Sequence, residues 1–375
     1  MIIGIDGNEA NTKRLVGIGE YAFELLSEFS RQKHQHKIVV YLKAKPLSHM
    51  PPETDTFQYE VFGPSRLWTQ FGLPIHLLLS REKPSVFFSP SHYVPRLSPA
   101  PRVMAIMDVS YVQYPQLFKA KDLYQLKHWT AYSVKKAKKI LTISEASKSD
   151  IIKEYNVTKD SVEVIYPGVK PIRALSPELF TMDRLQRDYG IAKNYILFVG
   201  TLQPRKNLLR LIEAFSQVLK KKNVPDDLQL VIVGKKGWLF EEILSAPEKY
   251  NIVDRIKFLD FVSDEELPAL YKNAICYVLP SLYEGFGLPV LEAMKYGCPV
   301  ITSNISSLPE AAGDAALFVN PEKTEEIENA LEKVITDEKL REVLIQKGYK
   351  QIKKFSWEKA ASETLRVLED VGGGK

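Results

Sequence analysis

One stretch of the chain combines glycines, a helix start and two carboxylates in a way that suits an anionic ligand. Residues 280–292 read PSLYEGFGLPVLE and follow the apolar run 274–279, which predicts a buried strand. Pro289 predicts the first position of a helix, where its missing N–H costs nothing. Glu284 and Glu292 bracket the loop, and each could equally be structural, as a solvated turn acid or a first-turn acid that complements the helix dipole. The backbone amides that could face an anion belong to Gly285, Phe286, Gly287 and Leu288.

A second stretch places two cations at the same kind of strand end. Residues 198–215 read FVGTLQPRKNLLRLIEAF, with a predicted strand that ends at Gly200. Arg205 and Lys206 directly precede Asn207, which is a good N-cap for the helix that follows. The helix dipole opposes a cation at a helix start, so the pair needs an anion there, and Arg and Lys together recognise phosphate well. Both stretches together suit a nucleotide sugar, with cations and amides on the diphosphate and carboxylates on ribose and sugar hydroxyls.

A third helix start with glycines lies close to the N-terminus. Residues 17–20 read GIGE, follow the first predicted strand by a loop and open a helix. Gly17 and Gly19 could let a diphosphate approach the backbone, although glycines are also common as turn residues. All three stretches satisfy the rule that open α/β sheets bind ligands at the carboxyl ends of their strands.

The elements that must position these residues alternate along the chain. Short apolar runs alternate with helical patterns, which indicates βα units and parallel sheets. A length of 375 residues favours two domains, because single cores stop growing at roughly 250 to 300 residues. Residues 166–190 interrupt the alternation with closely spaced prolines and are the best interdomain linker. Strands are predicted at residues 2–6, 37–42, 57–62, 86–89, 103–107, 140–143, 162–165, 195–200, 228–233, 256–259, 275–279, 300–302 and 316–319. Helices are predicted at residues 18–31, 69–81, 123–136, 145–155, 181–189, 208–221, 265–271, 289–295, 322–335, 338–353 and 357–370.

The positive charge of the chain is concentrated in its first half. The net charge is +5, and residues 1–170 carry 23 Lys and Arg against 16 Asp and Glu. Four lysines near the end of a predicted helix, which also carries Trp129 and Tyr132, form a cluster: Lys135, Lys136, Lys138 and Lys139. This cluster suits peripheral contact with an anionic membrane through the N-terminal domain, and it equally suits a solvated helix end favoured by its own dipole. Nucleic acid is not expected as a partner, because no recognised binding motif accompanies the charge.

The composition indicates a cytoplasmic globular protein. The hydrophobic share of 45% and the charged share of 26% are ordinary for such proteins. Asp6 lies where a signal peptide would need an apolar core, and no run approaches the roughly 18 apolar residues of a membrane span. Cys276 and Cys298 lie in apolar segments and are expected to be buried thiols. We therefore expect the protein in the cytoplasm, at the inner face of the membrane if the lysine cluster contacts lipid.

Several common phosphate motifs are absent from the sequence. No two aspartates are spaced D-x-D, so the carboxylate cage that usually holds a diphosphate-bridging metal is missing. There is also no G-x-x-x-x-G-K-[ST] loop for ATP and no G-x-G-x-x-G after the first strand for a dinucleotide. We expect no metal site and no cofactor besides the donor substrate, so the charge on a leaving group must be met by the protein itself.

The sequence resembles the GT-B glycosyltransferases of the large retaining family GT4, over nearly the whole chain. The matching segments are GIGEY from Gly17, MDVSYVQYP from Met107, TISEASKSDI from Thr142, VIYPGV from Val164, VGTLQPRKN from Val199, VIVGKKGW from Val231 and FLDFVSDEEL from Phe258. The most specific element is the pair Glu284 and Glu292, with GFGLPVLEAMKYGCPVITSN around it and SLPEAAGDAALFVNP after it. So ordered a set is hard to obtain by chance.

This resemblance implies an α/β fold of the GT-B type, with two Rossmann-like parallel-sheet domains facing a central cleft. Residues 1–170 would bind the acceptor, and residues 171–190 would be a linker region. Residues 191–355 would bind the nucleotide sugar, and the final helix at 356–375 would cross back to the N-terminal domain.

The resemblance also implies roles for the residues singled out above. By similarity, Glu292 would hold the ribose, Glu284 and the amides of residues 285–288 the donor sugar, and Arg205 and Lys206 the diphosphate. The loop of Gly17 and Gly19 would close over the same phosphates. Relatives of this type retain the anomeric configuration and need no metal, and the departing phosphate oxygen is thought to accept the proton of the acceptor.

The sequence departs from its relatives at one position. Many relatives carry His-Asp where this chain has Met107-Asp108, and that His lies near the donor sugar. Asp108 remains and could bind or orient the acceptor or the donor sugar, whereas a methionine cannot do the polar work of a histidine. His92 and His128 lie in the same half and could substitute, although each is as readily interpreted as a surface or core histidine.

The function implied is the transfer of a hexose from a nucleoside-diphosphate sugar to a saccharide or lipid-linked saccharide. GDP-mannose is the expected donor, because the segments SLYEGFGLPVLEAM and GDAALFVNP resemble those of bacterial mannosyltransferases. A UDP-sugar-dependent glycosyltransferase is the main alternative. A nucleotide-sugar epimerase on the same fold and a non-catalytic sugar-nucleotide-binding module are two further alternatives.

Overall fold

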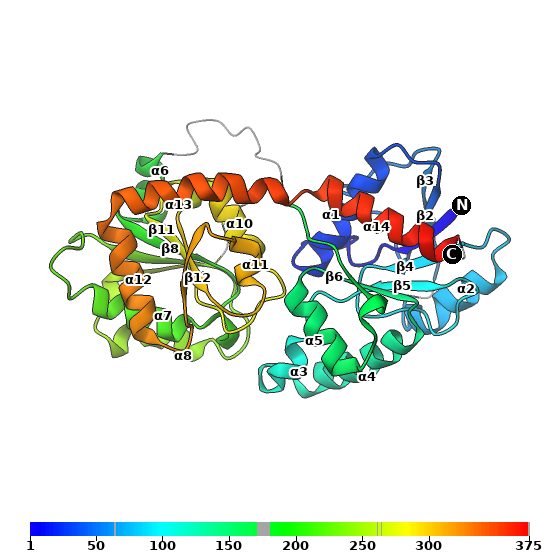
Figure 1. Cartoon of the computed structure of the whole chain (residues 1–375), viewed down its shortest axis with the longest axis horizontal. Helices are drawn as coiled ribbons and strands as arrows, with labels where there is room; N and C mark the ends of the chain where they lie inside the picture. The colour runs from blue at the N-terminus through cyan, green and yellow to red at the C-terminus, as the bar shows by residue number, and fades with distance from the viewer. Residues whose placement is uncertain (64, 171–180, 261, 264, 374–375) are drawn as a thin grey trace. The chain divides into compact units, whose positions relative to one another are not determined.

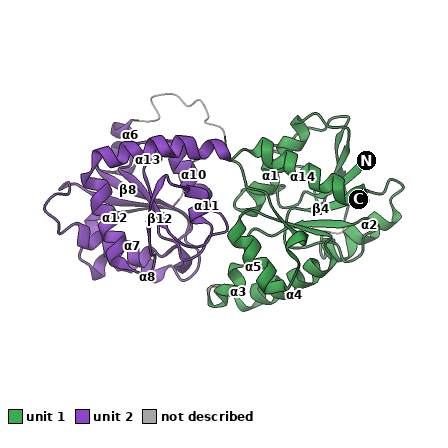
Figure 2. Ribbon diagram, viewed as in Figure 1, with its two compact units in different colours: residues 1–170, 355–375 green, residues 171–354 purple. Residues whose placement is uncertain are grey.

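The computed structural model describes residues 1–63, 65–170, 181–260, 262–263 and 265–373. The chain divides into two compact units, residues 1–170 with 355–375 and residues 171–354 (Figure 2). Residues 171–180, the first half of the predicted linker, lie outside the described residues, and the second half forms the short helix α6 (Met182–Tyr189).

Unit 1 contains, in its described part, a seven-stranded sheet in which all strand pairs are parallel (Figure 1). Its strands are β1 (Ile2–Asp6), β2 (Lys37–Leu42), β3 (Phe57–Val61), β4 (Val86–Ser89), β5 (Arg102–Ala105), β6 (Lys139–Thr142) and β7 (Val162–Val164). They lie in the order β3-β2-β1-β4-β5-β6-β7, so the order reverses between β1 and β4. Nearly every residue of the central strands is buried, as expected for a parallel sheet covered on both faces.

The helices of unit 1 follow from local sequence signals. The buried residues of α1 recur at helical spacing: Tyr21, Ala22, Leu25, Leu26 and Phe29. Ser144 caps α5 by accepting the Ser147 N–H at 3.0 Å, and Asn156 ends that helix in the left-handed conformation. The helical segments of the unit are α1 (Ile18–Arg31), η1 (Trp68–Gly72), α2 (Leu73–Leu79), α3 (Ser110–Gln113), η2 (Pro115–Leu117), α4 (Ala120–Lys136), α5 (Glu145–Tyr155), η3 (Lys159–Ser161) and α14 (Trp357–Gly372).

Unit 2 repeats the same architecture with a six-stranded parallel sheet in its described part. Its strands are β8 (Tyr195–Val199), β9 (Gln229–Val233), β10 (Ile256–Leu259), β11 (Cys276–Leu279), β12 (Val300–Ser303) and β13 (Ala316–Val319). They lie in the order β10-β9-β8-β11-β12-β13, so here the order reverses between β8 and β11. After α6 the helical segments are η5 (Pro204–Lys206), α7 (Leu208–Val218), α8 (Glu241–Lys249), η6 (Val253–Arg255), α9 (Leu267–Asn273), α10 (Leu288–Lys295), α11 (Leu308–Ala312), α12 (Thr324–Thr336), α13 (Glu338–Gln351) and η7 (Ile352–Lys354).

The predicted α/β class is confirmed in each unit, since both are Rossmann-like parallel-sheet domains. The arrangement of the two domains around a central cleft stays a prediction. Cys276 and Cys298 are buried free thiols. Among the described residues, no helix is both long enough and apolar enough to cross a membrane.

Prolines explain where the predicted helices differ from the observed ones. The helix predicted at 69–81 is split into a π-helical turn, η1, and α2, because Pro74 has no N–H to donate to a carbonyl in the preceding turn. The helix α8 was not predicted, because Pro247 within it argues against a helix in the sequence. It forms nevertheless, with Ile243 and Ala246 buried and two glutamates in its first turn.

The last helix of the chain belongs to unit 1. It packs against α1 and β4, and the Trp357 ring meets the Tyr21 ring edge to face at 6.0 Å between centroids. A Cβ on Gly168 would lie 2.1 Å from the Trp357 nitrogen, so the chain can pass the start of α14 only with a glycine at this position.

Candidate functional site

Two neighbouring strands of unit 2 bring the two chemical stretches together. β8 and β11 run parallel, with Ile196 beside Cys276. Because the carboxyl ends of parallel strands meet at one edge of the sheet, the loop that contains η5 lies next to the loop that leads into α10. The two loops are joined directly, since the Leu282 N–H donates to the Arg205 carbonyl at 2.9 Å. Residues 79 positions apart can therefore form one site.

The predicted cations and one predicted carboxylate form a buried ion cluster at this place. Lys206 Nζ donates to Glu284 Oε1 at 2.6 Å, and Arg205 Nη1 donates to Glu284 Oε2 at 3.1 Å. Ser281 Oγ also donates to Glu284 Oε1, at 2.6 Å. The three charged side chains keep only 9 to 15% of their surface exposed, so water screens their attraction much less than it screens a surface pair. The cation pair at this helix start is thus met, at least in part, by a carboxylate of the chain itself.

The electrostatics of the cluster keep Glu284 ionised. Burial alone raises the pKa of this carboxyl, but the adjacent Lys206 and Arg205 charges outweigh it and lower the pKa of Glu284 to about 2. Two cations and one carboxylate leave the cluster with one net positive charge. Such a cluster, beside a helix start, can accept an anion.

The glycine loop between β11 and α10 is held rigidly. The Glu284 carbonyl accepts hydrogen bonds from Ser306 Oγ at 2.7 Å and Ser307 Oγ at 2.8 Å. Gly287 has a φ of 101°, and a Cβ there would lie 2.7 Å from Leu308 Cδ2, so the loop requires glycine at this position. The helix begins one residue earlier than predicted, at Leu288, with Pro289 in its second position.

Glu292 lies one turn into α10, away from the loop that carries Glu284. Its Oε2 accepts a hydrogen bond from the Tyr271 hydroxyl of α9 at 3.2 Å, and its side chain is half-buried. Burial, and then the Glu292 charge, raise the pKa of Tyr271 far above its ordinary value, so Tyr271 remains a neutral donor. The role of Glu292 toward a ribose stays a prediction.

Asn207 does not cap α7 with its side chain, contrary to the sequence-based interpretation. It occupies the N-cap position with a φ of 60°, but its Nδ2 donates to the Pro280 carbonyl at 3.0 Å and the Pro321 carbonyl at 2.6 Å. The amide is used to tie the loops that follow β11 and β13, and is therefore not available for the helix. Sequence reasoning also missed the supporting serines at 281, 306 and 307, although each of them follows the end of a strand.

The two N-terminal glycines of unit 1 are required for different reasons. Gly17 is the N-cap of α1 with a φ of 53°, and a Cβ there would meet nothing within 4 Å. A Cβ on Gly19 would lie 2.8 Å from the Glu9 carbonyl oxygen, so this glycine lets α1 pack against the loop that follows β1. Gly17 thus leaves open space at the helix start, whereas the space beside Gly19 is taken by the chain itself. The predicted approach of a diphosphate to this loop stays a prediction.

Asp108 lies at the carboxyl end of unit 1's sheet, and His92 lies within its electrostatic reach. Asp108 follows β5 by three residues, and its Oδ1 accepts the Ser110 N–H at 2.8 Å. His92 follows the neighbouring strand β4 by the same three residues, which is the signal that sequence reasoning overlooked. Burial lowers the pKa of His92 and the Asp108 charge raises it. Its buried Nδ1 has no hydrogen-bond partner among the described residues.

His128, the other histidine considered, is an exposed residue of α4. Its Nδ1 bonds to the Tyr124 carbonyl at 2.9 Å, and its ring stacks on the Tyr124 ring. Within the described ranges, no group of three His, Cys, Asp or Glu side chains could hold a metal ion.

Two family models of glycosyltransferases match the chain, one in each half. Residues 16–173 match the family model described as "Glycosyltransferase Family 4", and residues 182–351 match "Glycosyl transferases group 1". O-antigen chain mannosyltransferase B of Escherichia coli is 28% identical over 370 residues, which cover 95% of this chain and 96% of that protein.

Solved structures share the fold over the whole length. Sucrose-phosphate synthase from Thermosynechococcus elongatus superposes with a TM-score of 0.75 at 17% identity, over all of both chains. Anabaena HepE, solved in complex with UDP-glucose, superposes with a TM-score of 0.73 at 19% identity, over 98% of this chain and 99% of that one.

Proposed function

Because the chain belongs to the glycosyltransferases, with the Family 4 model matching one half and the group 1 model the other, we propose that it transfers mannose from GDP-mannose to a saccharide. The acceptor is a saccharide or lipid-linked saccharide of glycan biosynthesis. The transfer retains the anomeric configuration and needs no metal ion.

The observation that carries the proposal is the ion cluster of Arg205, Lys206 and Glu284. It lies where the strand order of unit 2 reverses, beside the start of α10, and it has one net positive charge. In the proposed reaction an acceptor hydroxyl oxygen bonds to the anomeric carbon while the bond from that carbon to the diphosphate breaks. The two cations take up the charge that develops on the leaving diphosphate, and a departing phosphate oxygen accepts the hydroxyl proton.

Two donors remain in competition, each with an observation in its favour. The Escherichia coli relative, named a mannosyltransferase, matches nearly the whole chain and favours GDP-mannose. The Anabaena protein was solved with UDP-glucose, and its likeness in fold favours a UDP-sugar as the second candidate. Thermal unfolding of the full chain with GDP, UDP and ADP separates them, because a ligand that binds the folded state raises the midpoint by mass action. If UDP stabilises the protein and GDP does not, the donor is a UDP-sugar and not GDP-mannose.

Product analysis tests the reaction itself. Incubation with GDP-mannose should release GDP through transfer, or through slow hydrolysis when no acceptor is present. NMR of the glycoside should give the same anomeric configuration as in the donor, and EDTA should leave the rate unchanged. A strict need for Mg²⁺ or an inverted product would contradict the mechanism. Absence of any GDP release would favour a binding module, and an isomerised donor would favour an epimerase.

We also propose that Glu292 binds the ribose of the donor. Glu292→Ala should then weaken binding of bare GDP in titration calorimetry by about tenfold, the effect of losing a hydrogen bond to a charged group. Glu213→Ala is the matched control, because Glu213 is a half-buried glutamate on α7 of the same unit. Equal affinity of Glu292→Ala and wild type would remove this role.

Asp108 is proposed to orient the acceptor or the donor sugar. Its position after β5 and its fixed turn with Ser110 favour a defined orientation of the carboxylate. Asp108→Asn should lower the rate of transfer while leaving GDP affinity unchanged. A parallel loss of GDP affinity would place Asp108 on the nucleotide instead.

Contact with an anionic membrane remains part of the proposal. The C-terminal end of α4 carries the exposed residues Lys135 and Lys136. Lys139, by contrast, is the first residue of β6 and forms an ion pair with Glu163 at 3.7 Å. Exposed apolar side chains at helical spacing over η1 and α2 offer a second contact: Leu67, Phe71, Ile75, Leu78 and Leu79.

Vesicle sedimentation separates these two surfaces. Phosphatidylglycerol vesicles should bind the chain and phosphatidylcholine vesicles should not. The double variant Lys135→Glu/Lys136→Glu and the double variant Phe71→Ser/Leu79→Ser should each reduce binding if both surfaces contribute. Equal binding of the two vesicle types would contradict an electrostatic contact.

A further inference from the structure

The short helix α11 supports the loop that carries Glu284, residues 281–287, which is called the Glu284 loop below. Ser307, the N-cap of α11, donates its hydroxyl to the Glu284 carbonyl at 2.8 Å. The helix also lies against the end of the loop, since a Cβ on Gly287 would stand 2.7 Å from Leu308 Cδ2. The path of the Glu284 loop therefore depends on where α11 lies.

The helix α11 is too short to hold itself in place. Its five residues make little more than one turn, and the last four carbonyls of a helix have no partner within it. Local backbone N–H groups satisfy the first and the last of these four, at Pro309 and Ala312. The two between them, at Glu310 and Ala311, accept hydrogen bonds from a side chain of another helix.

That side chain is Gln351, the last residue of α13. It is only 3% exposed, and its Nε2 donates to the Ala311 carbonyl at 2.9 Å and to the Glu310 carbonyl at 3.3 Å. On the other side of the amide, Lys354 Nζ donates to Gln351 Oε1 at 2.8 Å. Two carbonyls can only accept and an ammonium can only donate, so these partners allow one orientation of the amide.

Packing around Gln351 leaves its amide little room to move. A Cβ on Gly313, the C-cap of α11, would stand 2.6 Å from Gln351 Oε1 and 2.8 Å from its Nε2, so the amide lies directly on the end of the helix. The helix α10 lies against both α11 and α13 (Figure 1). A Cβ on Gly348 of α13 would stand 3.1 Å from Met294 Cγ of α10. The helix α13 thus holds α10 directly and α11 through Gln351.

We propose that Gln351 is a positioning residue for the donor site, because by holding the end of α11 it keeps the Glu284 loop in the conformation that binds the nucleotide sugar. The inference rests on the proposed function, in which this loop binds the donor. Loss of the amide should leave the bound complex unchanged and lower the fraction of free protein whose loop is ready to bind. The apparent affinity falls in proportion to that fraction. The donor KM should therefore rise while kcat stays, whereas a residue that contacts the leaving diphosphate should lower kcat.

Gln351→Met tests this role, because it keeps the length of the side chain and removes its hydrogen bonds. The donor KM should rise by about tenfold, with kcat within about twofold of wild type. The Kd of the nucleotide that stabilises the wild type, GDP or UDP, should rise by the same factor in titration calorimetry. Gln346→Met is the matched control, an exposed glutamine of the same helix, and should keep both constants. Val334→Ala truncates a buried side chain of α12 and should lower the unfolding midpoint without changing either constant.

Lys354 provides a milder test that does not depend on the folding of Gln351→Met. Lys354→Met removes only the ammonium that fixes the amide, and should raise the donor KM about two- to threefold. Lys354→Arg keeps a cationic donor and should restore the wild-type KM. A wild-type KM in Lys354→Met, together with an unchanged Kd in folded Gln351→Met, would overturn the proposal. A fall in kcat as large as the rise in KM would also overturn it.

Hydrogen exchange of the ligand-free chain tests the link between Gln351 and the loop without any donor. Amides of residues 281–288 and 308–313 should exchange several-fold faster in Gln351→Met than in wild type, and those of β9 should not change. Unchanged exchange in residues 281–288 would overturn the positioning role, and so would faster exchange with unchanged nucleotide affinity. If the wild type turns over no nucleotide sugar, the proposed reaction falls, and exchange in the Glu284 loop alone decides whether Gln351 positions it.

Discussion

In both units the strand order reverses beside the first strand of the sheet, between β1 and β4 in unit 1 and between β8 and β11 in unit 2. Each reversal carries a nearly buried carboxylate, Asp6 in unit 1 and Glu284 in unit 2. Glu284 is held by two cations, which overcome burial and lower its pKa to about 2. Burial dominates at Asp6, where the hydrogen bonds of Asn8 only partly oppose it, and raises its pKa to about 6.

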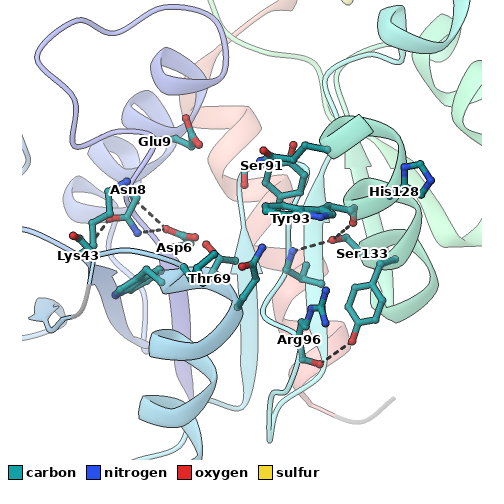
Figure 3. A pocket seen from close by; sticks show the side chains of 18 of the residues that line it. Asp6, Asn8, Glu9, Lys43, Thr69, Ser91, Tyr93, Arg96, His128 and Ser133 are labelled. Atoms are coloured by element: carbon teal, nitrogen blue, oxygen red, sulfur yellow. Dashed lines mark hydrogen bonds between the residues drawn. The ribbon is translucent and has the colours of Figure 1, made fainter. Parts of the chain in front are cut away.

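The difference shows that topology decides where a ligand binds and side chains decide which ligand it is. A paired carboxylate in a cluster of net positive charge suits a phosphate-bearing donor. The carboxylate of Asp6, in a pocket of unit 1 that the half-buried rings of Tyr93 and Trp129 also line, suits the hydroxyl-bearing acceptor expected in this unit (Figure 3). Both halves of a transfer reaction can thus be built on the same kind of sheet.

The largest effect should come from removing the carboxylate of unit 2. Glu284→Ala leaves two nearly buried cations without their shared partner, and should lower the free energy of unfolding by about 3 to 5 kcal/mol. Urea unfolding measures this loss. Glu292→Ala is the control and should cost about 1 kcal/mol, because Glu292 accepts its hydrogen bond from the neutral Tyr271 hydroxyl. Equal losses in the two variants would show that the cluster gives Glu284 no special stability.

Removing either cation should act on turnover more than on folding. Arg205→Ala and Lys206→Ala each leave Glu284 with one cation and Ser281, so the protein should stay folded by circular dichroism. We expect kcat/KM to fall about 10 to 150-fold, the effect of one lost charge-assisted hydrogen bond of about 1.5 to 3 kcal/mol to the leaving diphosphate. Arg184→Ala, which breaks an ion pair with Glu266 elsewhere in unit 2, should keep the wild-type rate. Wild-type kcat/KM in a folded Arg205 or Lys206 variant would remove the diphosphate role.

Local patterns in the sequence predict the scaffold well, because each apolar run lies between loop residues. The predicted bounds of β1, β2, β4, β10 and β13 agree with the structure. The helix α11, which has only five residues, and the helix α8, which contains a proline, were missed. Their formation depends on burial against neighbouring elements, and spacing alone does not show it.

The sites were predictable only in part, for a related physical reason. The types of Arg205, Lys206 and Glu284 indicated phosphate and sugar chemistry, but their pairing depends on β8 and β11 being neighbours, and the sequence does not show strand order. The unit 1 pocket was not predicted at all. Its lining comes from the ends of several strands, from η1 and from α4, and no single motif contains enough of it.

A smaller effect with opposite sign should separate the two carboxylates by pH. The folded pKa of Asp6, about 6, lies above its ordinary value of 3.8, so ionisation of Asp6 lowers the stability of the fold. This loss of stability is absent below pH 3.8, grows as the pH rises from 3.8 to 6, and is complete above pH 6. Asp6→Asn should therefore gain stability relative to wild type, by about 2 kcal/mol, between pH 4 and pH 7.

Glu284 gives the reverse case. Its folded pKa, about 2, lies below its ordinary value of 4.5, so the wild type's advantage over Glu284→Gln should be complete above pH 4.5 and shrink as the pH falls toward 2. Urea unfolding across this range measures both. A stability difference that is independent of pH for Asp6→Asn would show that burial does not control this carboxyl.

The smallest effect concerns the glycine loop that is expected to close over the donor phosphates. Gly17 has a φ of 53° and open space around its Cβ position, so Gly17→Ala should cost about 1 to 2 kcal/mol of backbone strain without a clash. If a phosphate approaches the loop, the new methyl group stands in that space, and the KM for the donor should rise several-fold at temperatures where the variant is fully folded. Gly19→Ala is the comparison, since its methyl group would press on the Glu9 carbonyl and should lower the unfolding midpoint instead. An unchanged donor KM in Gly17→Ala would show that Gly17 shapes the start of α1 and does not contact the donor.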